Sequence, residues 1–187
     1  MSFLELAKKR YSVREFSDKL IDRNDIQKMI LAADLAPSAQ KINPWKFIAI
    51  DDKNLKLELC KRAFKTPFVN SFVKNAPTII VACSKINILT HRIFGKIQGL
   101  EYHLLDMGAS IQNIILEASD LGIGSCWIGW FNEKEIKKLL QIPKNYKVVS
   151  LVALGYEKNE ENKKIKNLDK KISEIKTKKI ILFNKFE

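Results

Sequence analysis

The sequence predicts a single α+β domain, and three observations support this fold class. The chain has 187 residues, 46% of them hydrophobic, which is the size and composition of one compact domain. An apolar stripe at helical spacing runs through residues 104–121, as in a helix packed on a core. Short apolar runs at 45–50, 78–83 and 147–155 are typical of buried strands. We therefore expect one domain over residues 1–187.

The first half of the chain is predicted to begin with two helices. A short helix covers residues 3–9, and a second begins at a capping box formed by Asn24 and Gln27 and is stopped by Pro37. A loop then leads into the strand at 45–50. Residues 54–75 show a weakly amphipathic helical pattern ahead of the strand at 78–83.

The central part of the chain contains the strongest predicted element. Residues 85–99 have little periodicity, and we expect a mobile connection that covers a site. The core helix at 104–121 follows, and Gly122 is placed to end it. Gly108 and Ala109 are small, so this helix permits the close approach of a partner's backbone.

The last part of the chain is predicted to reach another subunit. Asn132 and Glu135 form a capping box for a helix that runs through Leu140, and the strand at 147–155 follows. Beyond Tyr156 the composition shifts to Lys, Glu and Asn. An apolar run at 180–183 then predicts a strand that joins the sheet of a second copy.

The net charge of +12 raises the question of nucleic-acid binding, which needs clustered basic residues. Residues 1–156 hold 23 basic and 15 acidic side chains, and residues 157–187 hold 10 and 6. The excess is spread over both parts, so a solvated basic surface is favoured over a nucleic-acid site.

The apolar runs and the cysteines exclude several other classes. No apolar run approaches the ~20 residues of a membrane helix, and the N-terminus lacks a secretory pattern, so we expect a soluble, cytoplasmic protein. Cys60, Cys83 and Cys126 are odd in number and form no C-x-x-C pair. We expect buried thiols, without disulfides or a metal site.

Polar side chains alternate near the start of the chain. If residues 10–14 are extended, Arg10, Ser12 and Arg14 lie on one face, where two guanidinium groups and a hydroxyl can meet an anion. An exposed basic turn would have the same pattern, so both interpretations stay open at this point.

Two further segments have the composition of ligand-binding backbone. Residues 36–47, A-P-S-A-Q-K-I-N-P-W-K-F, place two prolines around a polar loop, which predicts a stiff backbone with amides free to meet a ligand. Residues 122–129, G-I-G-S-C-W-I-G, contain glycines that allow backbone to approach a flat ring.

Together these three segments, in this order and spacing, resemble the nitroreductase family over nearly the whole chain. The resemblance implies an α+β fold with a central, mostly antiparallel sheet flanked by helices. It also implies an intertwined homodimer that exchanges its C-terminal strand and binds FMN. The cofactor-binding residues that it implies are Arg10, Tyr11, Ser12, Arg14, Pro37, Ser38, Ala39, Lys41, Asn70, Ile128, Gly129, Lys164 and Lys166.

The resemblance implies a role for each position. Arg10 and Ser12 would hold the FMN phosphate, Arg14 would stabilise negative charge at N1 and O2, and Tyr11 would contribute mainly backbone. Pro37, Ser38 and Ala39 would reach the flavin from the other subunit, Asn70 would pair with the ring edge, and the backbone at Ile128 and Gly129 would face N5. Lys41 and Asn43 replace the family's Asn and Gln, and the C-terminal phosphate pair is Lys164 with Lys166, or in another register Lys170.

The implied activity is transfer of hydride from NADH or NADPH to a small acceptor, such as a nitroaromatic or quinone, by a ping-pong mechanism. No side-chain acid or base is implied, since the flavin carries the chemistry. A dehalogenase or a flavin reductase would use the same site. From a different class, a non-catalytic basic binding module remains an alternative.

The remaining candidate residues are expected to be structural. Trp45 and Trp127 are expected to pack in the core. His103 is expected at the surface where the core helix starts, and His91 lies in the 85–99 connection, so neither histidine is assigned a catalytic role.

Overall fold

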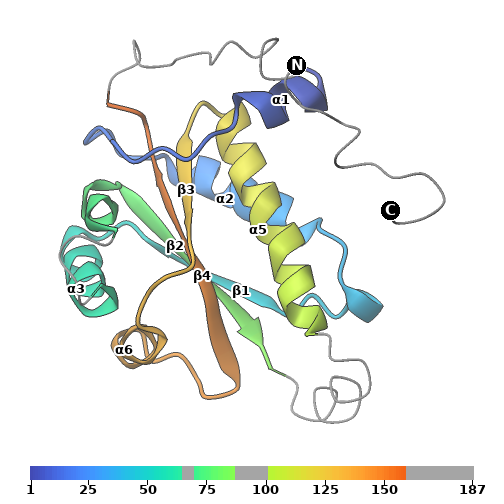
Figure 1. The fold of residues 1–187 in the computed structure, drawn as a ribbon, viewed down its shortest axis with the longest axis vertical. Helices are drawn as coiled ribbons and strands as arrows, with labels where there is room; N and C mark the ends of the chain where they lie inside the picture. Colours follow the sequence, from blue (N-terminus) through green and yellow to red (C-terminus); the bar gives the residue numbers. More distant parts are fainter. Residues whose placement is uncertain (65–69, 87–100, 159–187) are drawn as a thin grey trace, which may run out of the picture.

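The computed structural model describes residues 1–64, 70–86 and 101–158, and its centre is a four-stranded antiparallel sheet (Figure 1). The strands are β1 (Trp45–Ile50), β2 (Thr78–Lys85), β3 (Gly124–Ile128) and β4 (Tyr146–Gly155), in the order β1-β2-β4-β3. The predicted α+β class and antiparallel sheet are confirmed, and β1 has its predicted bounds. β3 is a correction, because the sequence interpretation treated residues 122–129 only as a glycine-rich segment.

Helices cover both faces of the sheet. On one face lie α1 (Phe3–Lys9), α2 (Arg23–Asp34) and α5 (Tyr102–Asp120). On the other lie α3 (Lys53–Ala63), α6 (Glu133–Leu139) and the 3-10 turn η2 (Ser71–Asn75). The prediction of a helical stretch at 54–75 is confirmed only in part, because α3 ends at Ala63, Phe64 is extended, and Ser71–Asn75 form a separate 3-10 turn. Residues 65–69 lie outside the described part.

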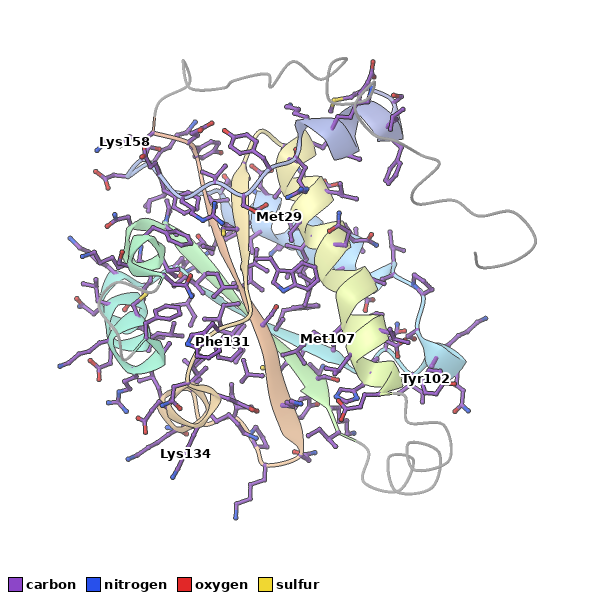
Figure 2. The ribbon with its side chains drawn as sticks, viewed as in Figure 1. Met29, Tyr102, Met107, Phe131, Lys134 and Lys158 are labelled. Atoms are coloured by element: carbon purple, nitrogen blue, oxygen red, sulfur yellow. The ribbon has the colours of Figure 1, made fainter. Side chains whose placement is uncertain are left out.

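The central strand β2 is buried on both faces, which explains its continuous apolar run. Ile79 and Val81 pack with α3 and α6, whereas Ile80 and Ala82 pack with α2 and α5. Met29 of α2 and Met107 of α5 are fully buried between the helices and the sheet, while Lys134 points away from α6 (Figure 2). The sheet thus separates two apolar layers, each closed by its own helices.

The apolar stripe of α5 behaves as predicted. Met107, Ile111 and Ile114 are all fully buried. The helix ends in a Schellman motif, in which the Gly122 N–H donates to the Ser119 oxygen at 3.2 Å and the Ile123 N–H to the Ala118 oxygen at 2.7 Å. Gly122 has a φ of 74°, so its predicted role at the helix end is confirmed.

The predicted start of α2 is wrong by two residues. Its N-cap is Asp22, whose carboxylate accepts the Asn24 N–H at 2.7 Å. Ile21 and Ile26 are both buried in the same core on either side of this cap, an arrangement that fixes the entry of the chain. In α6 the Asn132 cap is confirmed, since its side chain accepts the Glu135 N–H.

His103 is buried rather than exposed, with 8% of its surface accessible. The reason is that α5 begins at Tyr102, so His103 lies one turn before Met107 on the core face. Trp45 is buried as predicted, and its Nε1 donates to the Asp34 carboxylate at 2.8 Å. His91, the 87–99 part of the predicted connection and the 180–183 strand lie outside the described residues.

Candidate active site

The N-terminal segment lies in extended form beside the edge strand β3 (Figure 1). The Val13 N–H donates to the Ser125 oxygen at 2.9 Å, and Ser12 forms a parallel bridge with Ser125. Val13 and Phe16 are buried, whereas Ser12 and Arg14 are exposed. The predicted alternation is confirmed for Ser12, Val13 and Arg14, which presents a hydroxyl and a guanidinium group on the outer face, but it does not extend to the exposed Tyr11 and the half-buried Arg10.

Gly124 is required by the closeness of this segment. A Cβ at Gly124 would lie 2.7 Å from Val13 Cγ2 and 3.1 Å from the Gly155 oxygen. The sequence interpretation assigned glycines of 122–129 to a flat ligand, but Gly122 serves the helix end and Gly124 serves the N-terminal segment. Gly129 differs from both, because a Cβ there would meet nothing within 4 Å.

Arg14 is supported by an aromatic pair. Its Cζ lies 5.9 Å from the centre of the Phe72 ring, which in turn lies 6.5 Å from the Phe16 ring. Burial raises the pKa of the Cys126 thiol, while the Arg14 charge and a hydrogen bond with Ser12 lower it. Arg14 and Ser12 therefore both lie near the same point of β3.

The segment is also tied to the end of β4. The Tyr11 hydroxyl donates to the Glu157 carboxylate, and burial together with this contact raises the pKa of Tyr11. Phe16 bridges to Glu157, and the Ser17 N–H donates to the Tyr156 oxygen at 2.8 Å. Tyr11 thus contributes a side-chain anchor, where mainly backbone was expected. Arg10 is half-buried at the end of α1.

Asn70 connects η2 to the turn that follows β3. Its backbone is left-handed, with a φ of 56°, and its Nδ2 donates to the Trp130 oxygen at 3.2 Å. The Asn70 side-chain amide, which was expected to pair with the edge of the flavin ring, therefore holds Trp130, the residue after Gly129. Two separately predicted site segments are in this way joined by one hydrogen bond.

The turn itself combines a fixed backbone with exposed rings. Ile128 is buried, and the Asn132 N–H donates to the Ala63 oxygen at 2.8 Å. Trp127 is 43% exposed and Trp130 79% exposed. The prediction of a buried Trp127 is wrong, because in the edge strand Cys126 and Ile128 take the covered face. Trp130 was not singled out by the sequence, where its position directly after Gly129 was the available signal.

The loop at 36–43 is more strongly hydrogen-bonded than predicted. It contains the 3-10 turn η1 (Ala39–Lys41). The Ser38 hydroxyl donates to Asn43 Oδ1 at 2.6 Å and accepts the Asn43 N–H at 3.0 Å, and the Ala39 N–H donates to Asp106 Oδ1 at 3.0 Å. The amides of Ala39 and Asn43 are therefore occupied within the chain, and the prediction that they are free is wrong.

Within one chain, this loop is not brought to the N-terminal segment. Figure 1 shows them near opposite ends of α5, with the loop near the start of that helix and α1, which leads into the N-terminal segment, near its end. Pro37 and Lys41 are exposed, and Lys41 has a left-handed φ of 55°. Lys164, Lys166 and Lys170 lie outside the described residues.

Metal and thiol chemistry have no built site in the described part of the chain. Over 1–64, 70–86 and 101–158, no three His, Cys, Asp or Glu side chains form a cluster that could hold a metal ion. Cys83 and Cys126 are buried in the apolar core, and burial raises the pKa of Cys83 to about 11. No helix within the same ranges is long and apolar enough to cross a membrane.

Comparison of the sequence with known proteins finds relatives in the nitroreductase family. A family model described as "Nitroreductase family" matches residues 7–156. A protein of Archaeoglobus fulgidus named as an NADH dehydrogenase/NAD(P)H nitroreductase is 35% identical over 163 residues, covering 85% of this chain and 87% of that protein. An iodotyrosine deiodinase of Thermotoga neapolitana is 23% identical over 173 residues, covering 81% of this chain and 87% of that protein.

Solved structures agree with the fold described above. A nitroreductase family protein from Clostridium novyi NT has a TM-score of 0.76 and 37% identity, covering 90% of this chain and 92% of that one. An FMN-dependent nitroreductase from Clostridium difficile R20291 has a TM-score of 0.74 and 28% identity, covering 97% and 98%. These matches show that the chain belongs to the nitroreductase family of FMN-dependent NAD(P)H oxidoreductases.

Proposed function

We propose that two copies of this chain form a homodimer that binds FMN at each of two shared sites and passes hydride equivalents from NADH or NADPH to a small acceptor. The observation that carries the proposal is the N-terminal segment along β3. It presents Ser12 and Arg14 outward on a backbone that is fixed at Val13, and β3 ends at Ile128, directly before the open position of Gly129.

The residues present fit a flat, phosphorylated ring. Hydroxyl and guanidinium groups bind phosphate and a developing negative charge. Ser12 and Arg14 supply both kinds of group beside β3, and Arg10 lies just before them at the end of α1. The absence of any atom within 4 Å of a Cβ at Gly129 leaves its backbone accessible to a planar ligand. Bound FMN would supply the hydride chemistry at its N5 atom.

Each group of the chain has a proposed role in that chemistry. Arg10 and Ser12 hold the phosphate, and Arg14, supported by Phe72, faces the pyrimidine edge and stabilises charge there. The backbone of Ile128 and Gly129 faces N5. Asn70 orients this turn through the Trp130 carbonyl, which leaves its own Oδ1 available to a ring-edge donor.

The second copy is proposed from two observations. The loop with Pro37, Ser38 and Ala39 is bonded to Asp106 near the start of α5, whereas the N-terminal segment with Arg14 pairs with β3, which follows the end of α5 (Figure 1). In one chain the two therefore do not join the same site. Helices α1, α2 and α5, which cover one face of the sheet, also expose large apolar side chains, which a second copy could cover. They include Phe3 (72% exposed), Leu4 (62%), Leu31 (62%), Leu35 (77%) and Leu105 (60%).

The donor and the acceptor are proposed to use one site in turn. No dinucleotide fingerprint of the G-x-G-x-x-G type occurs in the sequence, which supports a nicotinamide that binds only transiently. We infer ping-pong kinetics, with nitroaromatics or quinones as acceptors. A dehalogenase is the second candidate, and the deiodinase relative is the observation that favours it.

The test is the flavin content of the purified protein. We expect a yellow dimer with about one FMN per chain, bleached by NADH or NADPH without oxygen and recoloured by an acceptor. A panel of nitroaromatic, quinone and haloaromatic acceptors then separates the two candidates. A monomer that stays colourless with excess FMN would contradict the proposal and favour the basic binding module, whose binding should fall steeply with salt.

A further inference from the structure

One carboxylate of α5 holds the loop that is proposed to enter the second site. Asp106 lies in the first half of α5 and is half-buried, next to the fully buried Met107. Its Oδ1 accepts the Ala39 N–H at 3.0 Å. Met107 fixes the rotation of the helix against the sheet (Figure 2), so Asp106 is presented to the loop from a rigid support.

The loop needs such a support because its backbone is strained. Gln40, Lys41 and Asn43 all have positive φ, at 56°, 55° and 46°. Non-glycine residues keep this conformation only where surrounding contacts impose it, and such residues gather at functional sites. The strain therefore points to a loop whose shape is specified for a purpose.

Asp106 also supplies the hydrogen-bond acceptor that the N-cap residue of η1 does not provide. Ser38 precedes η1 but makes no cap hydrogen bond, because its hydroxyl is engaged with Asn43. The first N–H of the turn, from Ala39, would lack an acceptor without Asp106. A carboxylate suits that place, since free N–H groups at the start of a helical turn favour negative charge.

Asp106 is one of three polar side chains of α5 that bond to the stretch from the end of α2 to η1. Ser110 and Asn113 follow at intervals of four and three residues, so all three lie on one side of the helix. Ser110 Oγ donates to the Ala33 oxygen and Asn113 Nδ2 to the Ala32 oxygen, each at 2.9 Å. The end of α2 and the loop are thus fastened to the same helix.

We propose that Asp106 is a positioning residue of the shared site. It holds Pro37, Ser38 and Ala39 in the conformation in which they meet the FMN of the second copy. The inference rests on the proposed function, and it adds that a side chain outside the flavin site sets flavin affinity in the partner.

The first test compares flavin affinity in four proteins. Asp106→Ala is expected to raise the FMN dissociation constant about tenfold, the effect of one charge-assisted hydrogen bond. Asp106→Asn keeps an acceptor oxygen and is expected to stay within about threefold of wild type. Asp120→Ala is the matched control, because this aspartate is exposed at the far end of the same helix.

A second variant removes the same hydrogen bond from the donor side. Ala39→Pro eliminates the N–H at the first position of the turn, where proline is tolerated. Ser38 already has the extended backbone that a residue before proline requires, with φ −138° and ψ 151°. The double variant with Asp106→Ala should lose no more affinity than either single variant, and additive losses would overturn the inference.

The decisive test uses mixed dimers, purified with two different tags, of Arg14→Ala and Asp106→Ala chains. If the loop serves the partner, each site takes Arg14 from one chain and the loop from the other. One site of each mixed dimer then contains both substitutions, and the other site contains neither. About half of the sites should then bind FMN with wild-type affinity. If Asp106 acts only within its own chain, neither site is intact, and the absence of recovery overturns the inference.

The outcomes separate the inference from the proposed function. A wild-type protein that is monomeric or retains no FMN contradicts the proposed function itself. A wild-type dimer that binds FMN, together with an Asp106→Ala variant of equal affinity, overturns only the role of Asp106. The expected result is that Asp106→Asn binds FMN with nearly wild-type affinity and that about half of the sites in mixed dimers do so as well. If Asp106→Ala merely failed to fold, neither of these results would be obtained.

Discussion

Replacing Gly124 by alanine tests whether the N-terminal segment owes its position to the missing side chain. The added Cβ would lie 2.7 Å from Val13 Cγ2, 3.0 Å from Val13 Cβ and 3.1 Å from the Gly155 oxygen. Carbon atoms in contact are normally about 3.5–4.0 Å apart, so Val13 has to move outward by up to about 1 Å. Ser12 and Arg14 flank Val13 and have to move with it.

The size of the effect follows from how the strain is relieved. Val13 is 4% exposed, and its N–H is fixed to Ser125, so rotating the side chain cannot remove both close contacts. Overpacking of this kind costs about 1–3 kcal/mol. If the N-terminal segment moves away to relieve this overpacking, flavin binding has to bring it back against the new methyl group. The same free energy of about 1–3 kcal/mol is then lost from binding, which raises the FMN dissociation constant about 5- to 150-fold.

The assay is titration with FMN, together with urea unfolding of the flavin-free protein. Val13→Ala is the matched partner, because it removes the Cγ2 atom that the new methyl group meets. The double variant should bind FMN better than Gly124→Ala alone, a non-additivity that identifies the contact as the cause. Wild-type affinity in Gly124→Ala would refute the argument that this glycine places Ser12 and Arg14.

Three further outcomes follow from single contacts. Arg14→Ala should slow flavin reduction about 10- to 100-fold in stopped-flow mixing, yet cost only about 0.5–1 kcal/mol of stability, because its contact with Phe72 is exposed. Lys56→Met should cost about 1–3 kcal/mol in urea unfolding, since the buried Lys56 Nζ donates to the Ala76 oxygen at 2.5 Å. Burial raises the pKa of Cys83 from 9.0 to about 11, so its thiol contributes stability below pH 9 that is lost towards pH 11. This loss is about 2–3 kcal/mol, and Cys83→Ala should flatten the decline.

Elements that depend on local patterns were predictable from the sequence. The apolar stripe of α5, the Gly122 helix end and the β1 run each express a local rule of periodicity or capping, and all three are confirmed. The start of α2 shows the limit of such rules. Asp22 and Asn24 are both good caps, and the choice depends on Ile21 and Ile26 meeting in the core, which the local pattern does not reveal.

The errors share a physical cause, which is contact between residues far apart in the chain. β3 was missed because an edge strand with Gly124 and Ser125 lacks a long apolar run, and its role depends on pairing with β4. The exposure of Trp127 follows from the same edge position. The Ala39 amide was expected to be free because its acceptor, Asp106, lies 67 residues later.

In the proposed shared site, the separation of the 36–43 loop from the N-terminal segment in one chain couples cofactor binding to dimer formation. The loop is bonded to Asp106, which lies 14 residues, or about 20 Å along the helix, before the end of α5 at Asp120. Arg14 follows Val13, which is bonded to Ser125 in β3 beyond that end, so one chain presents its loop away from its own Arg14. A flavin that contacts Arg14 of one copy and Ala39 of the other binds the dimer more tightly than the monomer. Coupling of this kind is reciprocal, so FMN must strengthen the dimer by the same factor by which dimer formation strengthens FMN binding. Affinity for flavin should therefore fall on dilution of the protein, whereas a site built within one chain would show no such dependence.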